Sequence, residues 1–218
     1  MAVIHRTTLT PTKVELLTDW LPGRPWYRGG SAVPVLEKSG GFRLDDPEGE
    51  VGIEFMVVTD TAGPEPTAYL VPLTYRGAPL EGAGQGLVGT LEHGVLGKRW
   101  VYDGCHDPVL ATELLALIEG RAPAMAQSVS DTPDDEVTRG HSGGPLPRTA
   151  FTPSPADDES GTRLPVPAGT TLRVHRVLTP AAGNPPLPAQ GAVGHVAGGW
   201  AAPDGTRLRA VFMVLGAD

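Results

Sequence analysis

A single cysteine, Cys105, is present in this chain of 218 residues. One thiol excludes a disulfide within the chain and a zinc site built from several cysteines. Basic residues are also scarce: 17 Lys and Arg stand against 25 Asp and Glu, which gives a formal net charge of −8. Nucleic acids and anionic membrane surfaces attract basic proteins, so we expect neither as a partner.

Long apolar segments are missing as well. No run approaches the roughly 20 apolar residues of a membrane-spanning helix, and no charged-then-apolar leader opens the sequence. We therefore expect a cytoplasmic protein. Glycine and proline are abundant instead, at 29 and 23 residues, and the prolines are concentrated in residues 121–190, which indicates linkers and turns.

Two helices are predicted from their capping signals. Thr12 begins the first, with Glu15 at the spacing of a capping box and apolar residues at helical spacing behind it. The second begins at Asp107, a typical N-cap followed by Pro108, and ends at Gly120. Both helices present one apolar face, so we expect both to pack on a sheet.

Apolar alternation and turn residues predict the strands of that sheet. Pro72 cannot donate a hydrogen bond to a neighbouring strand, so its strand is expected at an edge or at a bulge. A Pro203-Asp204-Gly205 turn joins the last two strands. The expected strands are residues 2–9, 33–36, 41–44, 51–59, 67–76, 86–93, 98–103, 171–178, 191–201 and 206–215.

The domain organisation follows from these elements. Residues 1–120 hold both helices, whereas residues 121–161 are acidic, rich in Pro, Ser and Thr, and poor in apolar anchors, which predicts a flexible linker. Residues 162–218 contribute three strands, too few to be stable alone, so we expect them to complete the same sheet. The predicted fold is α+β: a curved, mostly antiparallel sheet with two packed helices and a mobile acidic loop.

Several words of this sequence resemble a known family. WLPGRPWYRGG (Trp20–Gly30), YLVPLTYRGAPL (Tyr69–Leu80), GTLEHGVLGKRW (Gly89–Trp100) and VYDGCHDPVLATELL (Val101–Leu115) are similar to the N-terminal cap domain of actinobacterial maltokinases and of shorter stand-alone relatives. The resemblance covers roughly residues 1–120. It implies a cystatin-like cap, in which helices pack on a curved antiparallel sheet.

Maltokinases phosphorylate maltose with ATP in the route from trehalose to α-glucan. Their histidine-glycine-aspartate catalytic loop and their metal-binding aspartate-phenylalanine-glutamate word do not occur in this chain. The resemblance therefore implies a non-catalytic, stand-alone cap-like module without a cofactor or metal, with an interaction or regulatory role in α-glucan, trehalose and maltose metabolism. Three alternatives stay open: a subunit of a split maltokinase or aminoglycoside-kinase-like enzyme, an accessory to glucan branching, and a carbohydrate-binding module.

A partner surface is expected to use aromatic and arginine side chains, which are enriched at protein interfaces. The expected partner is a protein, either a kinase that lacks its own cap or a glucan enzyme. Aromatic rings can also stack on a sugar, so a carbohydrate is the other partner considered. The candidate interface residues are Trp26, Tyr27, Arg76, Arg99 and Trp100.

A polar cluster near the predicted hairpin is the remaining candidate site. If His93 and Asp103 faced each other across the hairpin, with His106 nearby, they would form an acid–base pair or part of a metal site. The simpler interpretation is a solvated strand face and closed turns, which we favour because a metal needs three or four ligands. No catalytic or metal-binding residue is therefore assigned.

Two motifs match enzyme patterns without the required context. Gly140-His141-Ser142-Gly143-Gly144 has the pattern of a nucleophilic serine, but it lies in the predicted linker with no strand before it or helix after it. The glycines at 84, 86 and 89 match a dinucleotide fingerprint, but a strand follows them instead of a helix. We interpret both as turns.

Overall fold

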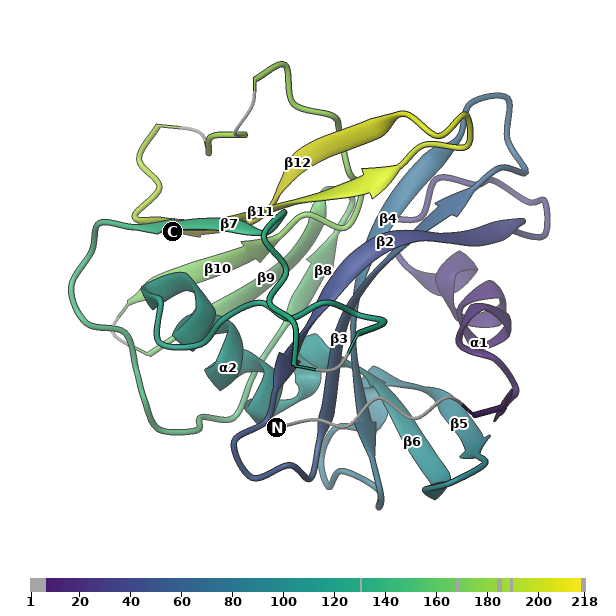
Figure 1. Cartoon of the computed structure of the whole chain (residues 1–218), viewed down its shortest axis with the longest axis horizontal. Coiled ribbons are helices and arrows are strands. Elements are labelled where there is room, and N and C mark those ends of the chain that lie inside the picture. Colours follow the sequence, from purple (N-terminus) through teal and green to yellow (C-terminus); the bar gives the residue numbers. More distant parts are fainter. Residues whose placement is uncertain (1–6, 130, 168, 184–185, 189, 217–218) are drawn as a thin grey trace.

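An antiparallel sheet runs through the whole molecule in the computed structural model, which describes residues 7–129, 131–167, 169–183, 186–188 and 190–216 (Figure 1). The strand order is β1-β5-β6-β4-β3-β2-β11-β12-β10-β9-β8, and β7 pairs with β11 beside this path. The predicted α+β class, a mostly antiparallel open sheet with two helices, is confirmed. The strands in the described residues are β1 (Leu9–Thr10), β2 (Leu36–Asp45), β3 (Gly52–Asp60), β4 (Thr67–Arg76), β5 (Leu87–His93), β6 (Gly97–Asp103), β7 (Thr138–His141), β8 (Ala156–Asp158), β9 (Gly161–Val166), β10 (Thr170–Val174), β11 (Gly194–Ala201) and β12 (Arg207–Gly216).

The central strands are covered on both faces. Helix α1 (Lys13–Trp20) and helix α2 (Pro108–Glu119) lie on opposite sides of β2, β3 and β4 (Figure 1). In β3, Phe55 packs into the cluster that contains α2 and the C-terminal strands, while its neighbour Met56 packs into the cluster that contains α1. Because successive strand residues point to opposite faces, both sets become buried, which explains why β3 is buried almost throughout.

Both predicted helix starts are confirmed. The Thr12 hydroxyl accepts a hydrogen bond from the Glu15 backbone N–H at 3.2 Å, and the Glu15 carboxylate accepts one from the Thr12 N–H at 2.7 Å. These reciprocal bonds satisfy two donors that α1 itself leaves unpaired. Asp107 caps α2, and Gly120 ends it with φ of 85°, a conformation that a side chain disfavours.

Pro72 lies in a central strand, so its placement at an edge is corrected. β4 lies between β3 and β6, but its second neighbour changes along its length. The Leu70 N–H donates to the Arg176 carbonyl, whereas pairing with β6 begins at Leu73, opposite Asp103. Leu70 and Pro72 direct their backbone nitrogens the same way, so the missing N–H of Pro72 falls at the break between the two neighbours.

The C-terminal strands complete the sheet, as predicted. β11 meets β2 where Trp200 is opposite Gly40, and β11 and β12 form the expected hairpin. Other expectations need correction: Leu36 and residues 41–44 belong to one strand, β2, whereas residues 33–35 precede it, and three short strands, β7, β8 and β9, were not predicted. Of the strand expected at residues 2–9, residues 1–6 lie outside the described part, and β1 begins at Leu9.

Residues 121–161 are anchored to the rest of the fold more than the sequence indicated. Met125 and Leu146 are buried, and Met125 exchanges two backbone hydrogen bonds of 2.9 Å with Arg43 of β2. The strands β7 and β8 also lie in this segment. The few apolar anchors of this segment are therefore enough to attach it to the sheet. Its anchors are isolated residues without periodicity, so no pattern reveals them.

Candidate functional site

A buried ion pair joins the first half of the chain to the second. Asp103, at the end of β6, accepts hydrogen bonds of 2.8 and 2.6 Å from Nη2 of Arg176, which follows β10. Arg176 is 0% exposed, and its guanidinium lies 5.2 Å from the ring centre of Trp26. The cation is therefore enclosed between a carboxylate and an aromatic face.

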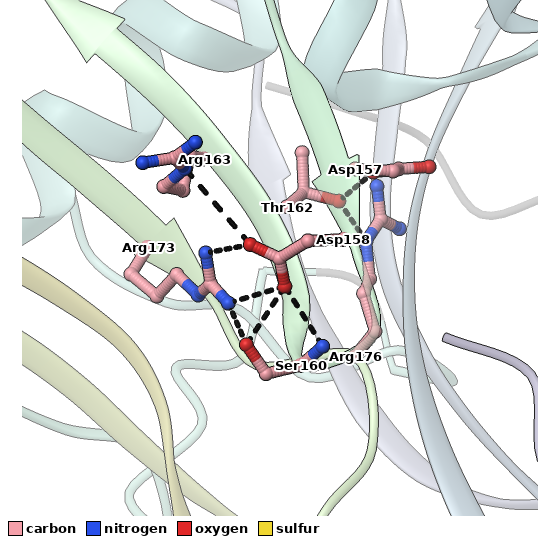
Figure 2. Close-up of polar contacts among 7 residues, drawn as sticks. All are labelled: Asp157, Asp158, Ser160, Thr162, Arg163, Arg173 and Arg176. Atoms are coloured by element: carbon pink, nitrogen blue, oxygen red, sulfur yellow. Dashed lines mark hydrogen bonds and ion pairs between the residues drawn. The ribbon is translucent and has the colours of Figure 1, made fainter. Parts of the chain in front are cut away.

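The network continues from Arg176 to β8, which is an edge strand of the sheet (Figure 2). Arg176 Nε donates to the Thr162 hydroxyl at 2.7 Å, and that hydroxyl donates to Asp157 at 2.5 Å. The next residue, Asp158, instead accepts bonds of 2.8 and 2.6 Å from Arg173. Asp157 is thus linked to Arg176 through the Thr162 hydroxyl, whereas Asp158 binds Arg173 directly. The two consecutive residues of β8 reach different arginines because they point to opposite faces of the strand.

The pKa shifts in this network indicate that its groups have a structural role. Burial on its own would lower the pKa of Arg176, but the Asp103 carboxylate outweighs it and raises the pKa above its ordinary value. Burial is the main cause that raises the pKa of the neighbouring Cys105 thiol, so this cysteine stays protonated and unreactive at neutral pH. The carboxylates of this network are paired with arginines or a hydroxyl, which fits a structural role.

A cavity of about 470 Å³ lies at one end of the sheet. It is bounded by the first turn of α1, the β5–β6 hairpin, the turn between β2 and β3, and Gln127 from the segment that follows α2. Apolar and polar side chains share its wall, as in small-molecule sites. The residues that line it include Leu9, Lys13, Arg43, Asp46, Glu50, Glu54, Tyr75, Leu91, His93, Leu96, Arg99 and Gln127.

Glu54 is the central polar group of the cavity wall. Its carboxylate accepts hydrogen bonds from Lys13, from the Tyr75 hydroxyl at 2.7 Å and from Gln127 at 3.1 Å, and Lys38 lies 3.5 Å away. Burial would raise the pKa of Glu54, but the charges of Lys13 and Lys38 and the hydrogen bonds hold it below its ordinary value. The carboxylate is therefore ionised and fully engaged.

Asp46 shapes the turn that forms another part of the wall. Its two carboxylate oxygens accept backbone hydrogen bonds from Glu48 at 3.1 Å, Glu50 at 3.0 Å and Val51 at 2.9 Å. The side chain is buried and faces its own loop. Asp46 therefore fixes the turn between β2 and β3.

The predicted polar cluster does not assemble. His93 is opposite Gly97 at the closed end of the hairpin, whereas Asp103 is opposite Leu73 of β4 at the other end of β6. His106 packs against Gly86 instead. His93 and Asp103 thus do not face each other, so the acid–base and metal alternative has no geometric support, and Asp103 is buried instead of lying on the solvated strand face that we favoured. Within the described ranges, no group of three or more His, Cys, Asp or Glu is placed to hold a metal ion.

The five candidate interface residues lie in three places. Trp26 is 0% exposed and belongs to the core, which removes it from any surface, and Tyr27 donates its hydroxyl to Asp60 at 2.9 Å. Arg76 and Trp100 are directly opposite each other on β4 and β6, so they share one face, where Arg76 also binds Asp107 at two distances of 2.7 Å.

Arg99 precedes Trp100 and therefore points to the other face of β6, where it lines the cavity together with His93. The sequence could not reveal this grouping, because Glu54, Tyr75 and Gln127 come from three distant segments. Arg176 was missed for the same reason: one arginine in a strand-like run carries no local signal of a buried partner.

Neither enzyme-like motif forms a site. Ser142 directly follows β7, its N–H donates to the Val193 carbonyl at 2.8 Å, and no helix follows it in the described residues. Residues 84–86 form a short 3-10 helix that leads into β5. A strand does precede Ser142, since Gly140 and His141 end β7, so the expectation that no strand comes before it is wrong; residues 84–86 are a turn, as the sequence indicated.

Residues 20–107 match the family model of the maltokinase N-terminal cap domain. The matched segment runs from the last residue of α1 through β2, β3, β4, β5 and β6 to Asp107, the N-cap of α2. The cap-domain resemblance is therefore confirmed, and this chain carries a maltokinase cap-like domain in that segment. No curated protein matches the chain. Among the described helices, none has the length and apolarity needed to span a membrane.

Proposed function

We propose that this protein is a non-catalytic cap-like module with an interaction or regulatory role in α-glucan, trehalose and maltose metabolism. Its partner is a kinase that lacks a cap of its own, or an enzyme that processes glucan. The observation that carries the proposal is the match of residues 20–107 to the cap-domain family model, together with the fact that the later strands join the same sheet. Strands β7 to β12 extend the cap sheet itself.

The contacts of the cap support this proposal. Both faces of its central strands are covered, by α1 on one side and by α2 with the C-terminal strands on the other. The N-terminal half of β4 is paired with residues 176–178. The proposed partner surface is the end of the β4–β6 pair, where the half-buried Trp100 lies opposite the half-buried Arg76 and Lys98 lies 5.2 Å from the Trp100 ring centre. An aromatic ring among cations is typical of interface anchors.

The test is capture of partners from native cell extract by the full chain, followed by reconstitution with the purified partner. We expect recovery of a sugar kinase or a glucan enzyme, identified by mass spectrometry, and at least tenfold weaker reconstituted binding after Trp100→Ala. Arg207→Ala on β12, in the other half of the sheet, is the control and should bind normally. The proposal fails if no such enzyme is recovered, or if both variants bind like the unaltered chain.

A further inference from the structure

We propose that the cavity beside Glu54 binds a neutral, polyhydroxylated small molecule: a sugar or related polyol of one or two rings. This inference goes beyond the proposed function and does not depend on it. The volume of about 470 Å³ lies within the range of small-molecule sites, roughly 300–1,000 Å³. The identity of the ligand follows from the charge, the polar groups and the apolar groups of the wall.

The charges of the wall argue for a neutral ligand. Lys13 and Lys38 are both paired with Glu54, and Arg43 is paired with Asp45. The carboxylate of Asp46 is engaged by three backbone N–H groups. An ion that entered this cavity would lose its hydration without meeting a surplus of opposite charge, so its desolvation cost would remain.

Arg99 and Glu50 do not change this balance, since they add one charge of each sign to the lining. Glu50 is exposed, and Arg99 donates from Nη2 to the Leu96 carbonyl at 2.9 Å. Charges of opposite sign in one wall favour a ligand that carries neither sign in excess.

The polar groups that converge on Glu54 retain both donors and acceptors for a ligand. Lys13 has three N–H donors, and Glu54 engages only part of that capacity. The Tyr75 hydroxyl donates to Glu54, so its oxygen lone pairs still accept. The Gln127 amide nitrogen donates to Glu54 and to the Phe55 carbonyl, which leaves its side-chain oxygen as an acceptor. A hydroxyl group both donates and accepts, and it matches such a mixed set.

The remaining wall is apolar. Leu9, Leu91 and Leu96 line the cavity from β1, β5 and the hairpin turn, and the ring of Tyr75 lines it from β4. A sugar ring carries hydroxyls at its rim and C–H groups on its faces, so it can meet both kinds of wall at once. Phosphate offers no apolar face, and a free amino acid brings an ammonium and a carboxylate group that would both have to be desolvated.

The experiment is calorimetric titration of the full chain with glucose, maltose and trehalose, and with glucose 6-phosphate and inorganic phosphate as charged probes. We expect saturable binding of at least one neutral sugar, and at least tenfold weaker binding of both charged probes. Tyr75→Phe should weaken sugar binding about tenfold, the effect of one lost hydrogen bond of about 1.4 kcal/mol.

Tyr27→Phe is the matched control, because Tyr27 also donates its hydroxyl to a buried carboxylate, that of Asp60, but does not line the cavity. It should bind sugar normally. Gln127→Leu, which removes a polar group from the wall at similar size, should weaken binding as Tyr75→Phe does. Melting temperatures of all variants establish that they are folded. The proposal is overturned if no neutral sugar binds at millimolar concentration, if the charged probes bind more tightly, or if Tyr27→Phe and Tyr75→Phe weaken binding equally.

Discussion

The cap region and the C-terminal region hold their strands together by different means. In the cap, aromatic rings form a continuous chain: Trp20 lies 5.9 Å from Trp26, Trp26 lies 6.0 Å from Tyr69, and Tyr69 lies 5.6 Å from Tyr27. The C-terminal strands instead share their rings with the cap: Phe212 stacks on Phe42 with ring centres 6.5 Å apart, and ion pairs such as that of Arg173 with Asp158 are added at the short strands (Figure 2). Buried rings stabilise strands more than exposed ion pairs do, so the C-terminal region is held chiefly by the apolar core that it shares with the cap.

The largest expected effect comes from breaking the buried ion pair of Arg176 with Asp103, which joins the two regions. Arg176→Met should lower the free energy of unfolding by about 3–5 kcal/mol, because Asp103 is left as a buried charge without its partner. Urea denaturation measures the loss. Arg207→Met, which breaks the exposed pair with Glu136, is the control and should cost no more than about 1 kcal/mol. Equal losses in the two variants would show that the buried pair does not join the regions.

The N-cap residues of the two helices give a smaller contrast: Thr12 begins α1, within the cap region, and Asp107 begins α2, at the boundary of that region. Thr12→Ala removes a neutral capping bond and should cost about 1 kcal/mol. Asp107→Ala should cost about 2–3 kcal/mol, because it removes the cap of α2 and also the two hydrogen bonds to Arg76. Thermal and urea unfolding of both variants measure the difference. The reverse order of the two losses would contradict this assignment.

The smallest effect concerns the exposed pair at β8, and it depends on pH. Hydrogen bonds from Arg173 and Ser160 lower the pKa of Asp158 below its unfolded value of about 3.9. The contribution of the ionised carboxylate is therefore present above about pH 4 and is lost as the pH falls from there through the lower folded-state pKa.

The measurement is urea unfolding of the unaltered chain and of Asp158→Asn at pH 7 and at a pH below 3. Because Asp158 is partly exposed, the variant should lose less than about 1 kcal/mol at pH 7. The difference between the two proteins should shrink on acidification. A difference that grows at low pH would contradict the proposed role of the carboxylate.

The sequence was a good guide wherever one segment carried the whole signal. The caps at Thr12 and Asp107, the hairpin of β5 and β6, and the turn at Pro203-Asp204-Gly205 were all predicted from residues close together in the chain. Strand β9 was missed because Pro165 interrupts its run, and β8 was missed because it is only three residues long and two of them are acidic. Such strands exist because neighbouring strands provide their hydrogen-bond partners, which no local pattern encodes.

The candidate site was less predictable than the fold. Of the residues named in advance, Arg99 and His93 line the cavity, while Trp26 proved to be core and Asp103 proved to be half of an ion pair. An aromatic or acidic residue in a strand looks the same in sequence whether it faces solvent or a buried partner. The side of the strand is decided by register, and Glu54, Tyr75 and Gln127 converge only after the two strands β3 and β4 and the segment that follows α2 are in place.

Native-state hydrogen exchange of the full chain tests most directly whether residues 108–216 complete the cap fold. The backbone amides of β3 in the cap and of β12 in the C-terminal region should exchange through openings of the same free energy, and Arg176→Met should lower both together. If β12 opened at a much lower free energy than β3, with β3 unaffected by that substitution, the C-terminal region would be a separate unit and the account would be wrong.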